Sequence, residues 1–376
     1  MPPKVKNDTA GYQQLKKDLA DQRPGRLYLF HGEETYLRDY YLEELRKQIL
    51  TGGMEAFNFH EISAKDMSPR RLEEELDCLP MMAQRTLVQV NDFDLFKAGA
   101  QDGEQYARLL EGLPEYVCLV FVYDLIPYEK SAKRSTKGKK KESGQKEKAK
   151  KKGEGQASLS DVFKKNGVVV NFARQDQWEL VKWVRRRFRA LGKDIEPNLA
   201  SELIFLCGDL MTNLVGEIEK IGAYAKGDQI TRRDIEAVAT PQLDTVVFQM
   251  TDAIGEGKFD RAAQVLGELF QMQVKPEVIM AALGRNMRQL YSARLAMERG
   301  KGASYVASLW GISSYPAEKL TGAARRFSLP WCRRAVVRCG QADLAIKSTG
   351  QDGRQLLTGL LLELSFPAQR PALPRR

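Results

Sequence analysis

The sequence FHGEET, at residues 30–35, follows the first apolar segment and is the natural place for a phosphate-binding loop. Such a loop has the pattern G-x-x-x-x-G-K-[ST], so that backbone N–H groups, a lysine ammonium and a magnesium-binding hydroxyl converge on the phosphates. This turn has one glycine, no lysine, and two carboxylates, Glu33 and Glu34, which would repel a triphosphate. Acids just before a predicted helix have a simpler role, since the helix N-terminus stabilises negative charge.

Nucleotide hydrolysis also needs an acidic pair after a later strand, to hold magnesium and orient the attacking water. The two candidates are Asp92, after the sequence VN, and Asp124, after a tyrosine. Neither is followed by a glutamate, so neither position offers an Asp-Glu pair. The sequence therefore predicts no ATP hydrolysis and no catalytic site.

Metal and nucleophile chemistry is poorly supported as well. The five cysteines lie far apart without a C-x-x-C pair, and the only histidines are His31 and His60. A structural zinc usually takes four Cys or His ligands at close spacing. No G-x-S-x-G elbow is present for a serine hydrolase. We therefore expect no metal and no cofactor, and free thiols in a reducing compartment.

The elements that would position these residues alternate in the first part of the chain. Strands are predicted at residues 26–30, 57–62, 85–90, 117–123 and 167–172, and helices at 36–49, 69–76 and 159–165. Ser68 and Pro69 give the start of the second helix a cap and a first-turn proline. Alternation of this kind predicts a three-layer α/β domain with a parallel sheet.

From residue 175 onward the periodicity is helical throughout. Helices are predicted at 178–188, 199–206, 210–224, 231–239, 246–255, 259–270, 277–299, 317–325, 330–346 and 353–364. Thr231 and Asp234 form a capping signature. In the first of these helices, Trp178 and Trp183 can either clamp nucleic acid together with the arginines after them or lie on a buried stripe, and we expect the buried stripe.

Composition places the chain among folded proteins and shows where its charge lies. The 376 residues are 43% hydrophobic and carry a net charge of +10, but residues 129–156 alone hold twelve Lys or Arg against four Glu. Most of the basic charge therefore belongs to a Lys-rich insert, for which a disordered linker is the expected state. No apolar run reaches the ~20 residues of a membrane helix and no secretory signal is present, so we expect a cytoplasmic protein.

These patterns give an expected domain organisation. Residues 1–173 form an α/β domain with the insert at 129–157, residues 174–240 a small helical domain, residues 241–366 a helical C-terminal domain, and residues 367–376 a tail. The proline at 241 marks the second boundary. A parallel α/β domain followed by a small helical domain is the layout of AAA+ ATPases.

Several segments resemble one known family in order and spacing. The opening RLYLFHGEETY (26–36), the segment LPMMAQRTL (79–87), GDL (208–210) with EIEKI (217–221), VFQMTDAI (247–254) and DLAIKSTG (343–350) are similar to the delta subunit of the bacterial DNA polymerase III clamp loader. The resemblance covers almost the whole chain apart from the insert and the two ends.

The resemblance implies a function and a contact site. Members of the family are degenerate AAA+ subunits that do not hydrolyse ATP, bind the sliding clamp and favour its open form, so that it can be loaded on primed DNA in replication. The clamp-binding turn of the family corresponds here to Leu79, Met81 and Met82, with Pro80 shaping the backbone. Without the resemblance, Leu79 and Met82 would be read as residues that seal a helix against the sheet.

The resemblance also implies partners, and two other functions stay open beside it. The C-terminal helices would form a collar that joins the ATPase and delta-prime subunits, inside a DNA-directed DNA polymerase (nucleotidyltransferase) holoenzyme at the nucleoid. One alternative is an active AAA+ ATPase with a divergent site at residues 31–35. The other is a nucleic-acid-binding protein that acts through Lys130–Lys152.

Overall fold

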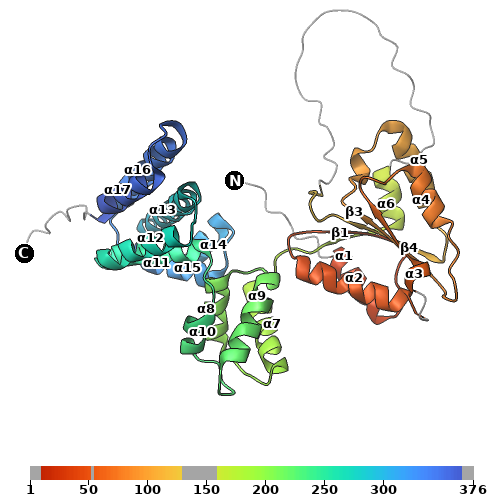
Figure 1. The fold of residues 1–376 in the computed structure, drawn as a ribbon, viewed down its shortest axis with the longest axis horizontal. Coiled ribbons are helices and arrows are strands. Elements are labelled where there is room, and N and C mark those ends of the chain that lie inside the picture. Colours follow the sequence, from red (N-terminus) through yellow and green to blue (C-terminus); the bar gives the residue numbers. More distant parts are fainter. Residues whose placement is uncertain (1–9, 52–54, 129–158, 366–376) are drawn as a thin grey trace, which may run out of the picture. The chain divides into compact units, whose positions relative to one another are not determined.

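The computed structural model describes residues 10–51, 55–128 and 159–365. These residues form two compact units, which meet in the sequence between Arg174 and Gln175 (Figure 1). The Lys-rich insert predicted at 129–157 lies outside the described residues, as does the tail after residue 365.

The first unit is built on one five-stranded sheet in which every pair of neighbours is parallel. The spatial order is β2-β3-β4-β1-β5. The strands are β1 (Leu27–His31), β2 (Phe59–Ser63), β3 (Thr86–Asn91), β4 (Val117–Val122) and β5 (Val168–Asn171). All carboxyl ends therefore meet at one edge of the sheet, where the turn at residues 31–35 follows β1.

Helices cover both faces of this sheet (Figure 1). On one face α1 (Ala10–Ala20) and α2 (Thr35–Ile49) pack on Tyr28 and Phe30 of β1. On the other face lie α4 (Pro69–Leu76), α5 (Ala100–Glu111) and α6 (Leu159–Asn166), which pack on Leu27 and Leu29. Two short helices, α3 (Glu55–Asn58) and a 3₁₀ turn (Leu95–Lys97), complete the unit.

The central strands explain why the sheet is buried on both sides. Every residue of β4 is buried; Leu119 and Phe121 face one helical layer, while Cys118 and Val120 face the other. A strand that is apolar at successive positions is stable only between two covering layers. The helix α4 begins as predicted, because the Ser68 side chain accepts a hydrogen bond from the N–H of Arg71.

The described part of the second unit consists of helices, with only an isolated bridge between Asp194 and Gln229. The helices are α7 (Gln177–Ala190), α8 (Pro197–Cys207), α9 (Met211–Tyr224), α10 (Arg232–Val238), α11 (Leu243–Gly255), α12 (Phe259–Gln271), α13 (Pro276–Glu298), α14 (Ala303–Trp310), α15 (Ser314–Ala324), α16 (Leu329–Ser348) and α17 (Gly353–Ser365). The fold class predicted from the sequence, a parallel α/β domain followed by helices, is confirmed.

The structure differs from the sequence prediction in some elements. Helices α1, α3, α5 and α14 were not predicted; α3 has only four residues, and α1 buries only Leu15 and Leu19. The prediction that Trp178 and Trp183 lie on a buried stripe is wrong, because Trp178 is 66% exposed and Trp183 is half-buried. The buried face of α7 instead consists of Leu180, Val181, Val184 and Phe188.

No single helix among residues 10–51, 55–128 and 159–365 is long and apolar enough to cross a membrane. Helices α8 and α9 reach that length and composition only as a pair, and the pair is bent by 118°.

Candidate functional site

The turn after β1 is tied to the rest of the protein rather than open toward a phosphate. Gly32 has a φ of +127°, and a Cβ there would lie 2.4 Å from the carbonyl oxygen of Phe172, so only glycine fits. The N–H of Glu34 donates to that same carbonyl at 2.9 Å. Glu33 pairs with Arg174 at 2.7 Å, and Glu34 is fully buried at the N-cap of α2. A backbone N–H that a phosphate loop would offer is thus already used.

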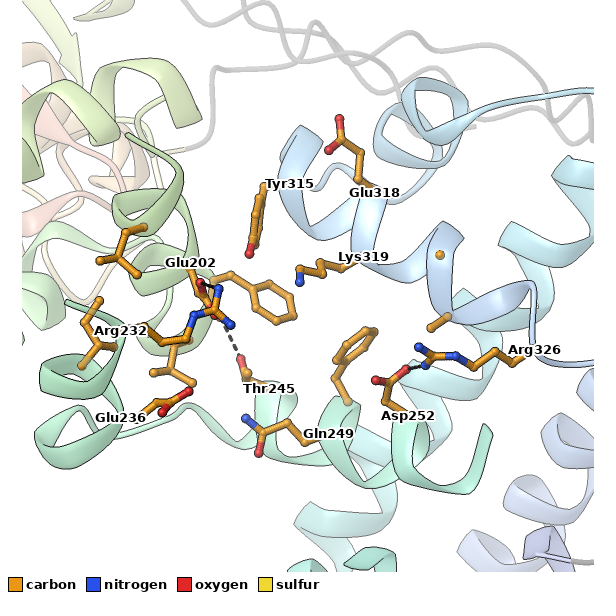
Figure 2. Close-up of a pocket in the computed structure, with 17 residues that line it drawn as sticks. Glu202, Arg232, Glu236, Thr245, Gln249, Asp252, Tyr315, Glu318, Lys319 and Arg326 are labelled. Atoms are coloured by element: carbon orange, nitrogen blue, oxygen red, sulfur yellow. Dashed lines mark hydrogen bonds and ion pairs between the residues drawn. The ribbon is translucent and has the colours of Figure 1, made fainter. Parts of the chain in front are cut away.

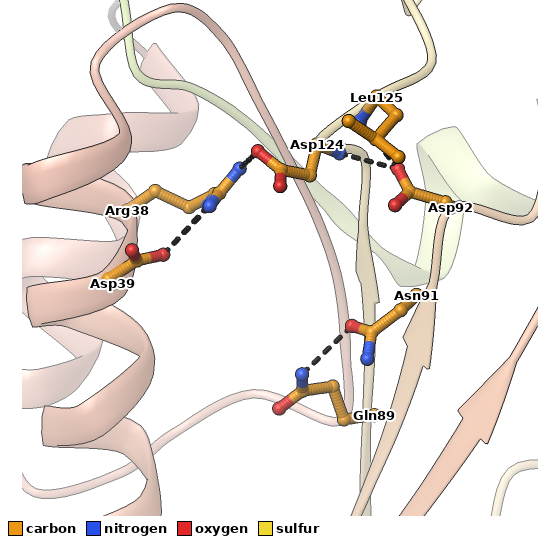
Figure 3. Close-up of polar contacts among 7 residues, drawn as sticks. All are labelled: Arg38, Asp39, Gln89, Asn91, Asp92, Asp124 and Leu125. Atoms are coloured by element: carbon orange, nitrogen blue, oxygen red, sulfur yellow. Dashed lines mark hydrogen bonds and ion pairs between the residues drawn. The ribbon is translucent and has the colours of Figure 1, made fainter.

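The two carboxylates that sequence analysis singled out lie at the same sheet edge and have structural partners (Figure 3). Asp92 accepts hydrogen bonds from the N–H groups of Asp124 and Leu125, at 2.8 and 2.7 Å. Asp124 accepts from the guanidinium of Arg38 at 2.5 Å, and that guanidinium also pairs with Asp39 at 2.9 Å. The Arg38 side chain is only 7% exposed. This network joins β3, β4 and α2, and it does not leave an acidic pair facing the turn.

A cavity of about 700 Å³ lies beside this turn, between the ends of β1, β4 and β5. Its walls include His31, whose ring lies 4.6 Å from that of Tyr128, and the paired Glu33 and Arg174. None of the described residues that line it is a lysine. The position is that of the ligand crevice in a parallel α/β fold, but the residues do not suit a triphosphate.

The segment between α4 and β3 projects apolar side chains into solvent. Leu79 is 74% exposed, Met81 49% and Met82 80%, while Pro80 is half-buried. The reading in which Leu79 and Met82 seal the helix against the sheet is therefore wrong. Three large apolar side chains exposed on one turn are the kind of patch that marks a protein-binding site.

The backbone of this turn is held in place by Asn58, at the end of α3. The Asn58 amide donates to the carbonyl of Met81 at 2.9 Å and accepts from its N–H at 2.7 Å. Asn58 itself is 1% exposed. Next to it, Met82 has a φ of +52°, the left-handed region that a residue with a Cβ adopts at a cost. The turn is thus a fixed loop with exposed side chains.

Arginine and tyrosine side chains fix both ends of the turn. Arg85, just before β3, donates to the carbonyls of Pro24, Gly25 and Val117 at 2.7, 2.9 and 3.1 Å. The hydroxyl of Tyr116 donates to the carbonyl of Leu76 at 3.3 Å, where α4 ends. These bonds connect the turn to the buried sheet.

A group of three potential metal ligands stands at the base of the turn, although the sequence spacing does not indicate it. Ligand atoms of His60, Glu75 and Cys78 lie within 4.8 Å of one another. His60 Nδ1 contacts Glu75 at 2.5 Å, and Arg71 also pairs with Glu75. Burial, together with the nearby Glu75 carboxylate, raises the pKa of the Cys78 thiol, which favours the neutral form. The arrangement links α4 to β2.

The second unit has its own cavity, of about 480 Å³, between α8, α10, α11 and α15 (Figure 2). Arg232 pairs with Glu202 at 2.6 Å toward one end, and Arg326 pairs with Asp252 toward the other. The ring of Phe205 lies 5.5 Å from Phe248 and 5.8 Å from Tyr315. The ion pairs and aromatic contacts join the four helices. Among the described residues that line the cavity we find no arrangement of nucleophile and base.

Asn58 is the residue that sequence reasoning missed. It lies in the segment FNFH, 23 residues before its partner Met81, and no motif or periodicity marks it. Only the pairing of β2 with β3 brings the two segments together. The exposed turn itself was found through a family resemblance.

Comparison with known proteins identifies relatives over most of the chain. The family model described as DNA polymerase III, delta subunit, matches residues 28–148, and the model of the C-terminal domain of the DNA polymerase III delta subunit matches residues 244–364. A probable DNA polymerase III subunit delta from Aquifex aeolicus is 22% identical over 364 residues, which cover 94% of this chain and 95% of the relative. The solved structure of the Bacillus subtilis DNA clamp loader delta protein is similar in fold, with a TM-score of 0.55 and 19% identity, over 94% of this chain and 99% of that one.

Proposed function

Because the chain belongs to the family of DNA polymerase III delta subunits, and so is a subunit of a clamp loader, we propose that it is the subunit that binds the sliding clamp and favours its open form. In this proposal the contact is the turn of Leu79, Pro80, Met81 and Met82, which we call the clamp-binding turn.

The observation that carries the proposal is the combination of exposed apolar side chains with a fixed backbone. Leu79 and Met82 are each at least 74% exposed, while Asn58, which holds the carbonyl and N–H of Met81, is buried. A fixed loop loses less conformational freedom on binding than a disordered one, so more of the contact energy appears as affinity. The turn therefore suits insertion into an apolar pocket on a partner.

The side chains are large enough to dominate such an interface. Full burial of a Leu or Met side chain stabilises by ~1.5–3 kcal/mol, less ~0.5–1.5 kcal/mol for the ordering of each flexible side chain. Methionine has three rotatable bonds, so Met81 and Met82 lose more freedom than an aromatic ring would. Together the three side chains have the size of a binding hot spot.

Ring opening follows if the turn fits the open ring better than the closed one. A ligand shifts an equilibrium between two states only by the difference between its affinities for them. The protein would then hold the clamp open without performing chemistry of its own.

The residues at the carboxyl edge of the sheet support the proposal that this subunit does not hydrolyse ATP. Asp92 is bonded to backbone N–H groups and Asp124 to Arg38, and the turn of Gly32 has no lysine. These contacts count against the alternative of an active AAA+ ATPase with a divergent site at residues 31–35. The other alternative, nucleic-acid binding through Lys130–Lys152, concerns residues outside those described.

The remaining parts of the proposal concern the assembly. We assign residues 174–240 to a helical lid domain and residues 241–366 to a collar that contacts the ATPase and delta-prime subunits. The complex would act on primed DNA in the cytoplasm, at the nucleoid. The test of the central contact is binding of the purified chain to the sliding clamp of the same organism, compared with a Met81→Ala/Met82→Ala variant.

A further inference from the structure

Helix α7 exposes an aromatic side chain where a buried one was expected. Trp178 is 66% exposed, although the same helix buries Leu180, Val181, Val184 and Phe188 on its other side. A tryptophan in solvent forgoes the large stabilisation that its burial would give. An exposed tryptophan beside several cations is therefore a candidate binding residue rather than a packing residue.

Three basic side chains lie on the same side of the helix as Trp178. They are Lys182, Arg186 and Arg189. Each lies three or four residues after the one before it, counting from Trp178, and this spacing places all four side chains along one face of the helix. All four residues are exposed. We call this set the α7 basic face; its twelve residues, from Trp178 to Arg189, extend ~16 Å along the helix.

Acidic groups near this face neutralise only part of its charge. Glu179 pairs with Lys182 at 3.2 Å, and Asp194 lies 3.3 Å from Arg189 and 3.6 Å from Arg185. Arg185 also donates to the carbonyl of Ile195 at 3.0 Å. The described carboxylates beside the face are thus fewer than its cations, and the surface keeps a positive excess.

The ring of Trp178 is suited to stacking. The Lys182 ammonium lies 4.3 Å from the centre of the Trp178 ring and covers one face of that ring. The Trp178 side chain is nevertheless 66% exposed. Bases stack on exposed aromatic rings with little dependence on sequence, while a line of cations follows the phosphates. Duplex DNA keeps its bases stacked inside, so an exposed ring favours single strands.

We propose that the α7 basic face binds single-stranded nucleic acid, with a base stacked on Trp178 and phosphates paired with Lys182, Arg186 and Arg189. This inference deepens the proposed function, because a loader that acts on primed DNA meets single-stranded template beside the primer. It rests on residues separate from the clamp-binding turn. It gives the second unit a direct contact with DNA.

The test uses the full chain and a labelled oligothymidine of about 16 nucleotides, with binding followed by fluorescence anisotropy from about 50 to 200 mM salt. Trp178→Ala and Arg186→Glu should each weaken binding at least about fivefold. Arg186→Glu should also lower the salt dependence by ~0.7 in log–log slope, which is the value of one phosphate contact on a single strand. The Lys-rich insert is the same in every variant, so differences report on α7.

Matched controls are Tyr305→Ala and Arg261→Glu, which change an exposed tyrosine and an exposed arginine on α14 and α12. Both should bind the oligonucleotide like the parent chain. The proposal is overturned if the two α7 variants bind as the controls do, or if a polyglutamate peptide binds the face as tightly as the oligonucleotide. Clamp binding, measured in parallel, should be unchanged in the α7 variants, so that failure here is distinct from failure of the clamp contact.

Discussion

The side chain of Asn58 and the backbone of Met81 form a pair of reciprocal hydrogen bonds, at 2.9 and 2.7 Å. Asn58 is 1% exposed and Met81 is 49% exposed. A buried amide thus holds an exposed residue in the way that a neighbouring strand would. The turn gains a defined shape without becoming part of the sheet, and its apolar side chains stay outside.

We expect Asn58→Ala to loosen the clamp-binding turn and to destabilise the first unit. It removes both bonds and leaves two backbone groups of Met81 without their partner, which should cost ~2 kcal/mol in the free energy of unfolding. Clamp affinity should fall about tenfold, because a mobile turn must be ordered on binding. Urea unfolding and clamp titration measure the two effects. A loss of stability with unchanged clamp affinity would refute the role of this anchor.

Met82→Gly should separate the strain of the turn from its contact. The left-handed backbone at Met82, with a φ of +52°, costs ~1 kcal/mol that glycine avoids, while glycine adds a similar amount of freedom to the unfolded chain. Stability should therefore change little, while clamp affinity falls at least about tenfold through the lost side chain. Met82→Ala is the control: it keeps the left-handed strain of the parent, so it should lose as much affinity as the glycine variant while its stability stays close to that of the parent. Equal clamp affinity of Met82→Gly and the parent would exclude this side chain from the interface.

Cys78 offers a chemical probe beside the turn in the natural sequence. It is half-buried, whereas Cys118, Cys207, Cys332 and Cys339 are buried, with the pKa of each raised by burial to about 12. Iodoacetamide should modify one thiol in the folded chain, slowly near neutral pH because the pKa of Cys78 is also raised, and faster as the pH rises.

Bound clamp should slow this modification several-fold, since Cys78 immediately precedes Leu79. Mass spectrometry of the modified peptide measures the rate, and Cys78→Ser should take up no label. A modification rate that is the same with and without saturating clamp would place the interface elsewhere.

The capping box of α10 should give the second unit a measurable pH dependence. Thr231 and Asp234 bond each other's N–H groups through their side chains, and the bonds from Thr231 lower the pKa of Asp234. Because the pKa of Asp234 is lower in the folded state than in the unfolded state, its ionised form stabilises the fold. This contribution to the free energy of unfolding is complete above the unfolded-state pKa of ~3.9 and is lost as the pH falls through the folded-state pKa.

Thr231→Ala should therefore cost ~1 kcal/mol near neutral pH, and the difference from the parent should narrow below about pH 4. Thr231→Ser, which keeps the hydroxyl, should behave like the parent. Urea unfolding at several pH values measures this. A difference that stays constant down to pH 3 would mean that Asp234 does not sense the cap.

Local patterns were sufficient to predict the strands and most helices. The unbroken apolar run of β4 predicted a strand buried on both faces, and Ser68 with Pro69 predicted the start of α4. These signals are local because they arise from side-chain periodicity and from the first turn of a helix. The boundaries agree to within a few residues.

Other features depend on tertiary contacts that the sequence does not show. The exposure of Trp178 was mispredicted because residues 178, 181, 184 and 188 share a helical spacing, yet only the last three pack on the neighbouring helices. The partners of Asp92 and Asp124 are backbone N–H groups and Arg38, which come together only when the strands pair. The hydrogen bonds between Asn58 and Met81 likewise form only when β2 pairs with β3.

The central claim is that Met81 and Met82 bind the sliding clamp, and one titration tests it most directly. The purified chain, without nucleotide, is titrated with the clamp of the same organism beside Met81→Ala/Met82→Ala. Met272→Ala is the matched control, because Met272 is 71% exposed in the other unit.

The account predicts tight binding by the parent chain and by the control, and binding about a hundredfold weaker in the double variant, since two apolar contacts are removed. Binding by the double variant as tight as that of the parent would contradict the site. Absence of clamp binding by the parent, together with magnesium-dependent ATP turnover, would contradict the proposed function itself.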